Sequence, residues 1–255
     1  MQAIIYNLLN KFFMNEIENE IIKFLRRENK IIFDIGCFKG NFTSNFIKRE
    51  DKLGYKSTFY MFDPNPRVKD YLRSMHINNK INYFNTALDN TNSKKKFYLN
   101  NFFEPSGSSL NTVAKDDKRW ITTRKIIMQI LQPYKRIENF SEINVQTQTL
   151  DNFCLSKGIK NIDVLKIDSE SNELNILKGA KNLLSENKIY LIYTEISESK
   201  KEYDIKEKNV LHFLNAYNFE LKKKYEIKSA SFLSDIKATD NIFVNKSFSV
   251  FTSYY

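Results

Sequence analysis

The run IIFDIGCFKG, residues 31–40, carries an acid and two glycines whose types and spacing could do chemistry. Asp34 lies in an apolar stretch typical of a buried strand, and Gly36 and Gly40 follow before a helical pattern. Glycines permit positive φ angles and let the backbone approach a ligand closely, while a helix N-terminus offers unpaired N–H groups. The pattern predicts a nucleotide-binding loop. A tight strand–helix turn without a ligand is the alternative interpretation.

A second acid, Asp63, closes the next apolar run in the motif FDPNP. In doubly wound folds an acid at this place accepts hydrogen bonds from both hydroxyls of a ribose. The pyrophosphate-binding pattern G-x-G-x-x-G is not matched, because Phe38 stands two residues after Gly36. A nucleoside without a diphosphate therefore fits better, and S-adenosylmethionine is the obvious one. The alternative role for Asp63 is to cap the helix that follows.

Near-continuous apolar runs alternate with helical or turn-rich pieces along the chain. Because the strands of a parallel sheet are buried on both faces, such runs predict an α/β fold with a mostly parallel sheet. Strands are expected over residues 30–35, 57–63, 81–88, 162–168 and 189–196, and helices over 42–49, 68–74 and 171–185. The pieces 217–227 and 241–251 predict an antiparallel pair at the C-terminal edge.

Two regions stand outside this alternation. Residues 1–29 have apolar positions at helical spacing and predict a helical extension before a single domain over residues 30–255. An inserted segment around residues 94–150 begins and ends with strand-like pieces, KKKFYLNN and INVQTQTL. Its Lys/Arg-rich middle, residues 111–140, is expected to be partly helical. It forms either a lid over the site or a surface excursion away from any ligand.

The composition narrows the class of protein. The 255 residues are 42% hydrophobic, as in a globular chain, and carry a formal net charge of +10. Nucleic acid is one partner that such a charge suits, but abundant Lys, Asn and Ile with scarce Gly and Pro favour a biased base composition as its cause. The chain has only two cysteines, far apart, and two histidines, which disfavours a structural zinc site. The two cysteines are typical of reduced thiols. With a poor signal peptide and no apolar run long enough to span a bilayer, a cytoplasmic location is expected.

Several motifs in order resemble the FkbM-type S-adenosylmethionine-dependent methyltransferases. The resemblance covers roughly residues 30–200 and rests on FDIGCFKGNFT (33–43), FDPNP (62–66), NTALDN (85–90), SGSSL (106–110), VQTQTLDNF (145–153) and, most specifically, IDVLKIDSESNELNILKGA (162–180). It implies a Rossmann-like class I methyltransferase fold with a seven-stranded sheet, and S-adenosylmethionine as cofactor. Some positions depart from the pattern. Ser171 replaces the usual glycine of a D-x-E-G turn, Ser169 replaces an aliphatic residue, and Cys37 and Phe38 replace a small residue and an asparagine in the first loop.

The resemblance also implies roles for individual residues. The cofactor-binding set is expected to be Asp34, Gly36, Gly40, Asp63, Ala87, Leu88 and Asp168. The catalytic set is Lys166, Asp168 and Glu170, at the end of a strand where ligands of open α/β sheets gather. Two carboxylates and an ammonium suit a general base with its electrostatic partner, and a purely structural ion-pair network is the alternative. Glu170, Glu195 and Ser108 are expected to contact the substrate, and no metal is expected.

The predicted activity is transfer of a methyl group to a hydroxyl, with a sugar in a glycan or polysaccharide as the preferred acceptor. A nucleic-acid methyltransferase is the first alternative, although the DSES sequence at residues 168–171 has no aromatic side chain to stack a flipped base. A non-catalytic domain that binds the cofactor is the second, if the altered turn at Ser171 no longer supports turnover.

Overall fold

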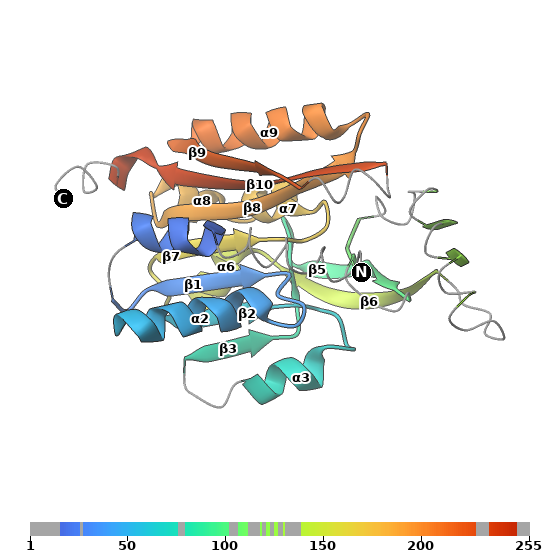
Figure 1. The fold of residues 1–255 in the computed structure, drawn as a ribbon, viewed down its shortest axis with the longest axis horizontal. Coiled ribbons are helices and arrows are strands. Elements are labelled where there is room, and N and C mark those ends of the chain that lie inside the picture. The colour runs from blue at the N-terminus through green and yellow to red at the C-terminus, as the bar shows by residue number, and fades with distance from the viewer. Residues whose placement is uncertain are drawn as a thin grey trace.

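A seven-stranded sheet forms the centre of the computed structural model, which describes residues 16–25, 28–75, 80–101, 107–111, 139–227, 235–248 and a few positions between 118 and 130. The strands lie in the order β3 (Ile81–Phe84), β2 (Thr58–Phe62), β1 (Ile31–Ile35), β7 (Ile162–Ile167), β8 (Ile189–Ser199), β10 (Ile236–Asn245) and β9 (Phe219–Glu226) (Figure 1). All neighbours pair in parallel except β10, which runs antiparallel to both β8 and β9. The predicted mostly parallel class I sheet with antiparallel C-terminal strands is confirmed.

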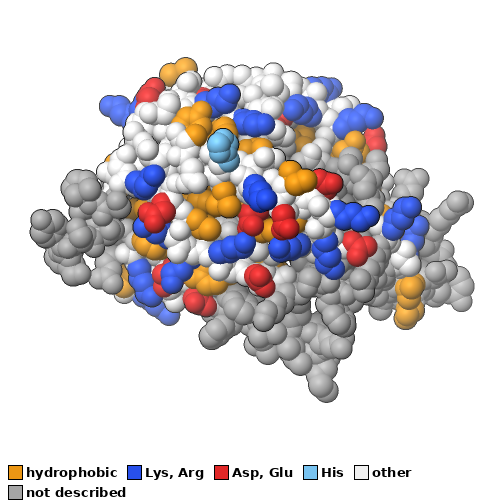
Figure 2. All heavy atoms as spheres, turned by 90° about the horizontal axis from the view of Figure 1, so that it is seen from above, with side chains coloured by type: hydrophobic (Ala, Val, Ile, Leu, Met, Phe, Trp, Pro, Cys, Tyr) orange, Lys and Arg blue, Asp and Glu red, His pale blue; other side chains and the backbone are white. Residues whose placement is uncertain are grey.

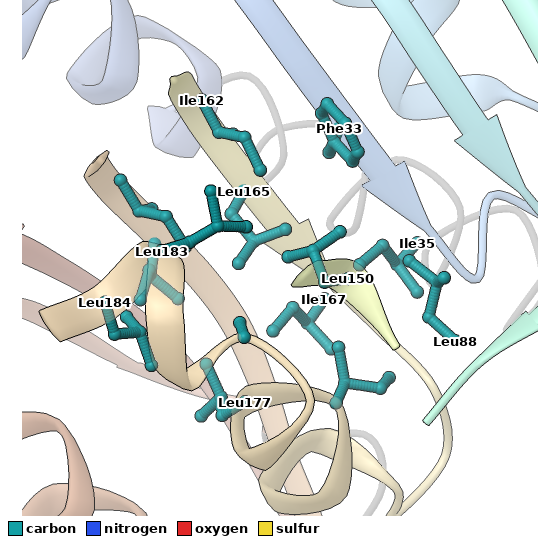
Figure 3. Packing of buried hydrophobic residues seen from close by; sticks show 14 of the residues in the cluster. Phe33, Ile35, Leu88, Leu150, Ile162, Leu165, Ile167, Leu177, Leu183 and Leu184 are labelled. Atoms are coloured by element: carbon teal, nitrogen blue, oxygen red, sulfur yellow. The ribbon is translucent and has the colours of Figure 1, made fainter. Parts of the chain in front are cut away.

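Helices cover both faces of this sheet. On one face pack α6 (Leu150–Lys157), α7 (Glu173–Lys178), α8 (Lys181–Ser185) and α9 (Tyr203–Ala216). On the other pack a helix over residues 16–24, α2 (Asn41–Leu53) and α3 (Lys69–Ser74). Figure 3 shows the first face, where Phe33 of β1 and Leu165 of β7 point toward Leu150 of α6 and Leu183 of α8. The central strands are apolar on both sides because both sides are covered.

A second, three-stranded sheet lies beyond the carboxyl ends of the central strands. It consists of β4 (Ala87–Leu88), β6 (Phe140–Gln148) and β5 (Ser93–Asn100), in that order, and is called the small sheet below. In Figure 1, β5 and β6 extend past the tips of β1 and β2. β5 pairs antiparallel and β4 parallel with β6. The two extra strands expected around residues 94–150 are therefore present, and together with β4 they form a second sheet.

The apolar run 81–88, predicted as one strand, is divided between the two sheets. The chain leaves the central sheet after β3 and enters the small sheet at β4. Side chains in between secure the change of direction: the Asn85 amide donates to the main-chain oxygen of Asp63 (3.0 Å) and the Thr86 hydroxyl to that of Gln146 (3.0 Å). The single-strand prediction was wrong because these partners are far away in sequence.

The predicted helix 171–185 is also divided, into α7 and α8. Asp151 caps the start of α8, because its carboxylate accepts hydrogen bonds from the N–H groups of Asn182 (3.0 Å) and Leu183 (3.0 Å). Gly179, between the two helices, allows a close approach of the chain, because a Cβ there would lie 2.2 Å from the main-chain oxygen of Asp89. The prediction of one continuous helix was wrong because the capping acid comes from α6.

The C-terminal strands differ in detail from the expectation. β10 begins at Ile236, before the predicted residue 241, and lies between β8 and β9, so only β9 forms the edge. Both cysteines are free and buried. No helix among the described residues has the length and apolar character needed to cross a membrane. The part of the N-terminal extension before residue 16 and most of the predicted lid, 111–140, lie outside the described residues.

Candidate active site

An open cleft lies between the carboxyl ends of the central strands and the small sheet. It encloses about 770 Å³, open solvent at its mouth included. The residues of its lining that the sequence analysis had predicted as site residues are Gly36, Asp63, Ala87, Leu88, Ser108, Asp168 and Glu170. Sequence reasoning assigned no cleft role to other lining residues, among them Asn65, Phe97, Leu110 and Asn172. The strand-end position of the predicted acids and glycine brings them together.

Gly36 is the point where three strands meet. Its φ is +69°, and a Cβ there would lie 1.7 Å from the main-chain oxygen of Asp168. The Gly36 N–H donates to the oxygen of Phe62 at the end of β2 (2.9 Å), and the Asp168 N–H donates to the oxygen of Ile35 (3.0 Å). Only glycine allows the ends of β1 and β7 to approach this closely.

Asp63 joins the loops that follow β1 and β2. Its Oδ2 accepts the Phe38 N–H (2.9 Å) and its Oδ1 accepts the Asn65 N–H (2.9 Å). Burial raises the pKa of Asp63 to about 6, although the two N–H donors oppose this shift. The helix-capping alternative does not apply, because the N-cap of α3 is Val68 and has no side-chain bond.

Two predicted cofactor contacts lie behind the cleft and not in its lining. Asp34 is fully buried and accepts the Thr43 hydroxyl of α2 (2.8 Å), so it supports the loop from below. Gly40 has φ +65° and precedes α2, and a Cβ there would lie 2.8 Å from Met61 Cε and 2.9 Å from Met75 Sδ. Glycine at position 40 therefore serves the packing of two methionines.

Lys166 connects the buried acid to the cleft. Asp34 and Lys166 are register partners on β1 and β7, and Lys166 Nζ lies 3.0 Å from Asp34 Oδ1 and 3.4 Å from Asp168 Oδ2. It also donates to the Gly36 oxygen (3.2 Å). Burial lowers the pKa of Lys166, but the two carboxylates raise it more, so the net shift is upward. Lys166 is therefore a permanent ammonium and not a proton acceptor.

The turn after β7, residues 168–171, is called the acid turn below. Its Glu170 and Ser171 have left-handed backbones, with φ of +51° and +80°. Burial, together with the charges of Asp168 and Glu173, raises the pKa of Glu170 to about 8. Ser171 thus adopts the conformation that a glycine would favour at its position, and its hydroxyl donates to the oxygen of Ser197 (2.6 Å).

A further acidic group lies beside the cleft, outside its lining. The Tyr193 hydroxyl donates to Asp240 Oδ1 (2.9 Å), and Glu195 is the register partner of Asp240 across β8 and β10. Burial and the charge of Asp168 raise the pKa of Asp240 to about 7, and burial with the charges of Asp168 and Asp240 raises that of Glu195 well above its usual value. The predicted substrate contact Glu195 is thus placed at the margin of the site.

Some of the lining residues that the sequence analysis did not identify could have been found from the sequence, and others could not. Asn65 lies in the FDPNP motif and Asn172 directly after the acid turn, so both were adjacent to recognised motifs. Phe97 and Leu110 carried no such signal, because their place in the cleft depends on how the small sheet packs.

Comparisons with known proteins find a family and a relative for this chain. The family model described as the methyltransferase FkbM domain matches residues 34–221. A relative, the 2-O-methyltransferase NoeI of Sinorhizobium fredii, is 26% identical over 188 residues, 72% of this chain and 70% of the relative.

Solved structures with similar chains are more distant. The N-methyltransferase NodS from Bradyrhizobium japonicum is 11% identical, with a TM-score of 0.43 over 91% of this chain and 96% of that chain. A TehB-like methyltransferase from Corynebacterium glutamicum is 10% identical, with a TM-score of 0.40 over 96% of this chain and 100% of that one. The family match, which spans most of the chain and its cleft, assigns this chain to the FkbM family as an S-adenosylmethionine-dependent methyltransferase.

Proposed function

We propose that this enzyme transfers the methyl group to a hydroxyl of a sugar, within a glycan or polysaccharide. The observation that carries the proposal is the placement of Asp168 and Glu170 together in the cleft lining, beside the buried ammonium of Lys166. The name of the relative NoeI, a 2-O-methyltransferase, supports oxygen as the accepting atom.

The residues of the cleft fit S-adenosylmethionine, which supplies an electrophilic methyl group on a cationic sulfonium. Asp63 has a buried carboxylate that can accept hydrogen bonds from two neighbouring ribose hydroxyls. Gly36 exposes backbone where any side chain would intrude. Ala87 and Leu88 provide apolar surface for a purine, and Asp168 supplies negative charge near the sulfonium. Asp34 and Gly40 act from behind, by holding the loop.

Glu170 is the proposed base for the acceptor. A hydroxyl is a weak acid, so its proton moves to the carboxylate only as the new C–O bond forms. When it is ionised, a half-buried carboxylate with a raised pKa accepts such a proton more readily than an ordinary glutamate does. Lys166 remains charged and fixes Asp168. Ser108, in the lining, orients the acceptor, and Glu195 acts on it from the margin of the cleft. The rate depends mainly on an in-line approach of the oxygen, which these contacts enforce.

The two alternatives find less support. On the face seen in Figure 2, Lys and Arg side chains alternate with Asp and Glu and do not gather into one basic patch. Lys222 and Lys224 of β9 pair with Glu220 (2.7 Å) and Glu207 (2.5 Å). Acids at the cleft would also repel a phosphate backbone. Against the non-catalytic alternative, Ser171 keeps the left-handed backbone of the acid turn.

The test is an assay of purified protein with S-adenosylmethionine and a panel of mono- and oligosaccharides. Formation of S-adenosylhomocysteine and of a methylated sugar, both detected by mass spectrometry, is the expected result. Glu170→Gln is expected to lower turnover by about 10²- to 10⁴-fold at nearly unchanged cofactor affinity, as for loss of a general base. If Glu170→Gln and Asp168→Asn both keep full turnover, the catalytic assignment is wrong.

The same assay separates the alternatives. Methylation of RNA or DNA in place of sugars, with binding that falls steeply as salt rises, would favour the nucleic-acid enzyme. Cofactor binding with no product on the sugar panel or on nucleic acid would favour the non-catalytic domain.

A further inference from the structure

Residues 107–111, called the 107–111 turn below, attach the small sheet to the acid turn. The Ser109 N–H donates to the oxygen of Tyr98 on β5 (3.1 Å), and the Tyr98 N–H donates back to the oxygen of Ser109 (2.8 Å). The Asn100 N–H donates to the Ser108 hydroxyl (3.0 Å). The 107–111 turn is thereby fixed to β5 by its backbone.

From this anchor, two side chains reach the main chain of the acid turn. The Ser109 hydroxyl is 2.6 Å from the oxygen of Glu170 and 3.1 Å from that of Ser169, so its one proton is shared between two carbonyls. The Asn111 amide donates to the oxygen of Ser171, and the Asn111 N–H donates to the Ser109 hydroxyl oxygen (3.0 Å). Three consecutive carbonyls of the acid turn thus have partners in the 107–111 turn.

The carboxylate of Glu170 is held by the same segment. The backbone N–H of Gly107 donates a hydrogen bond to it, which favours its charged form. A Cβ on Gly107, whose φ is +82°, would lie 3.8 Å from Glu170 Oε1. One short turn therefore contacts both the main chain and the acid group of the proposed base.

The acid turn requires such support because its backbone is strained. A residue other than glycine in the left-handed region costs about 1–2 kcal/mol, and Glu170 and Ser171 are two such residues in succession. Strain of this kind persists only where the surroundings over-determine it. On the other side, the Ser171 N–H and the Ser169 hydroxyl both donate to Glu173 Oε1 (2.9 and 3.0 Å).

We propose that Ser109 and Asn111 are positioning residues, which hold the left-handed acid turn from the small sheet and so keep the Glu170 carboxylate directed into the cleft. Ser109 is 3% exposed, and neither its hydroxyl nor the Asn111 amide needs to touch the reactants for this role. The inference rests on the proposed function only for the part that Glu170 plays in the reaction.

The experiment compares Ser109→Ala and Asn111→Ala with a matched control, Ser57→Ala. Ser57 is also 3% exposed, and its hydroxyl donates to Glu50 Oε1 (2.7 Å) next to the opposite end of β2, so its loss measures the general cost of a buried hydroxyl. The titration of Glu170 is followed by NMR of carboxyl-¹³C-labelled glutamate and assigned with Glu170→Gln. Thermal unfolding, cofactor affinity by calorimetry and turnover on a sugar that the wild type methylates complete the set.

In both variants of the 107–111 turn we expect the Glu170 titration to move from the wild-type midpoint toward the usual glutamate value of 4.5, because the freed carboxylate reaches water. We expect turnover to fall by about 10- to 100-fold, as for a misplaced catalytic group, with cofactor affinity nearly unchanged. Ser57→Ala should lower the unfolding temperature without either effect.

A Glu170 titration and a turnover in both variants equal to those of Ser57→Ala would overturn the inference. If Ser109→Ala does not fold, Asn111→Ala decides alone, since Asn111 is only partly buried. If the wild type methylates no sugar, the proposed function fails, while the titration still tells whether the 107–111 turn positions Glu170.

Discussion

The Cα of Gly36 lies against the main-chain carbonyl of Asp168, where a Cβ would come within 1.7 Å of the oxygen. Gly36→Ala therefore forces the ends of β1 and β7 apart and disturbs the wall of the cleft. We expect cofactor affinity to fall by at least about tenfold, in addition to an overpacking cost of about 1–3 kcal/mol in the free energy of unfolding. Calorimetry with S-adenosylmethionine and chemical denaturation measure the two effects.

Gly54→Ala is the matched control for this substitution. Gly54 has φ +72°, but no atom lies within 4 Å of its Cβ position, so alanine there adds only backbone strain of about 1–2 kcal/mol. Cofactor affinity should stay at the wild-type value. Equal results for Gly36→Ala and Gly54→Ala would show that the contact with Asp168 relaxes at no cost.

Asp63 should give cofactor binding a pH dependence. Burial raises its pKa from 3.8 to about 6, so the carboxyl is ionised above that pH and protonated below it. A protonated carboxyl accepts fewer hydrogen bonds from ribose hydroxyls, and affinity should weaken as the pH falls from about 7 to about 5. Asp63→Asn should bind weakly at every pH. A wild-type affinity that is flat across this range would contradict the proposed contact.

The same carboxyl has the opposite effect on folding. Because its pKa is higher in the folded state, the folded chain binds the proton more tightly than the unfolded chain does. Its contribution to stability is therefore complete below pH 3.8 and is lost as the pH rises through about 6. Denaturation of wild type and Asp63→Asn across this range isolates the contribution, since only the wild type has the titrating group.

Removing Lys166 should unfold the protein more readily than removing a surface lysine. Lys166→Met leaves the fully buried Asp34 without its counter-ion, and breaking a buried pair in this way costs about 3–5 kcal/mol in the free energy of unfolding. Asp34→Asn in the same chain should restore part of the loss. Lys96→Met, which breaks an exposed pair with Glu142, should change denaturation little. Additive effects of the Lys166 and Asp34 substitutions would contradict the pairing.

Ser171→Gly should be tolerated. Glycine relieves left-handed strain of about 1–2 kcal/mol, while the lost hydrogen bond to Ser197 removes about 1 kcal/mol, so the free energy of unfolding should change by no more than about 1 kcal/mol. Ser171→Val should destabilise strongly, because a branched side chain resists this backbone. A valine variant as stable and active as the wild type would show that the acid turn does not need its left-handed conformation.

The central sheet could be predicted because its evidence is local. β1 and β7 are apolar on both faces, and Gly36 and Asp63 directly follow strand ends. The division of residues 81–88 could not be predicted, because one uniform apolar run gives no sign of a change of sheet. What decides it is a bond from Thr86 to Gln146, sixty residues further along the chain.

The placement of the candidate site residues could be predicted only in part. Strand-end acids, including Asp168 and Glu170, lie in the cleft as expected, whereas Gly40 serves the packing of methionines behind it. Glu195 ends up beside the lining, because strand order alone does not set the depth of a side chain. Ser109 and Asn111 hold a turn that lies sixty residues later in the sequence, and no spacing rule connects them with it.

The pairing of β5 with β6 also makes the position of the acid turn independent of the length of the chain that connects these two strands. The Asn101 N–H donates to the oxygen of Asn139 (3.0 Å), so the chain leaves β5 and returns to β6 at neighbouring points. The entropy of closing a loop grows only logarithmically with its length, by about 0.6 kcal/mol for each doubling. A change in the length of the connection between Asn101 and Asn139 therefore has a small cost in closure entropy. Insertions and deletions in this connection, outside the 107–111 turn, therefore leave the contacts that hold the acid turn in place.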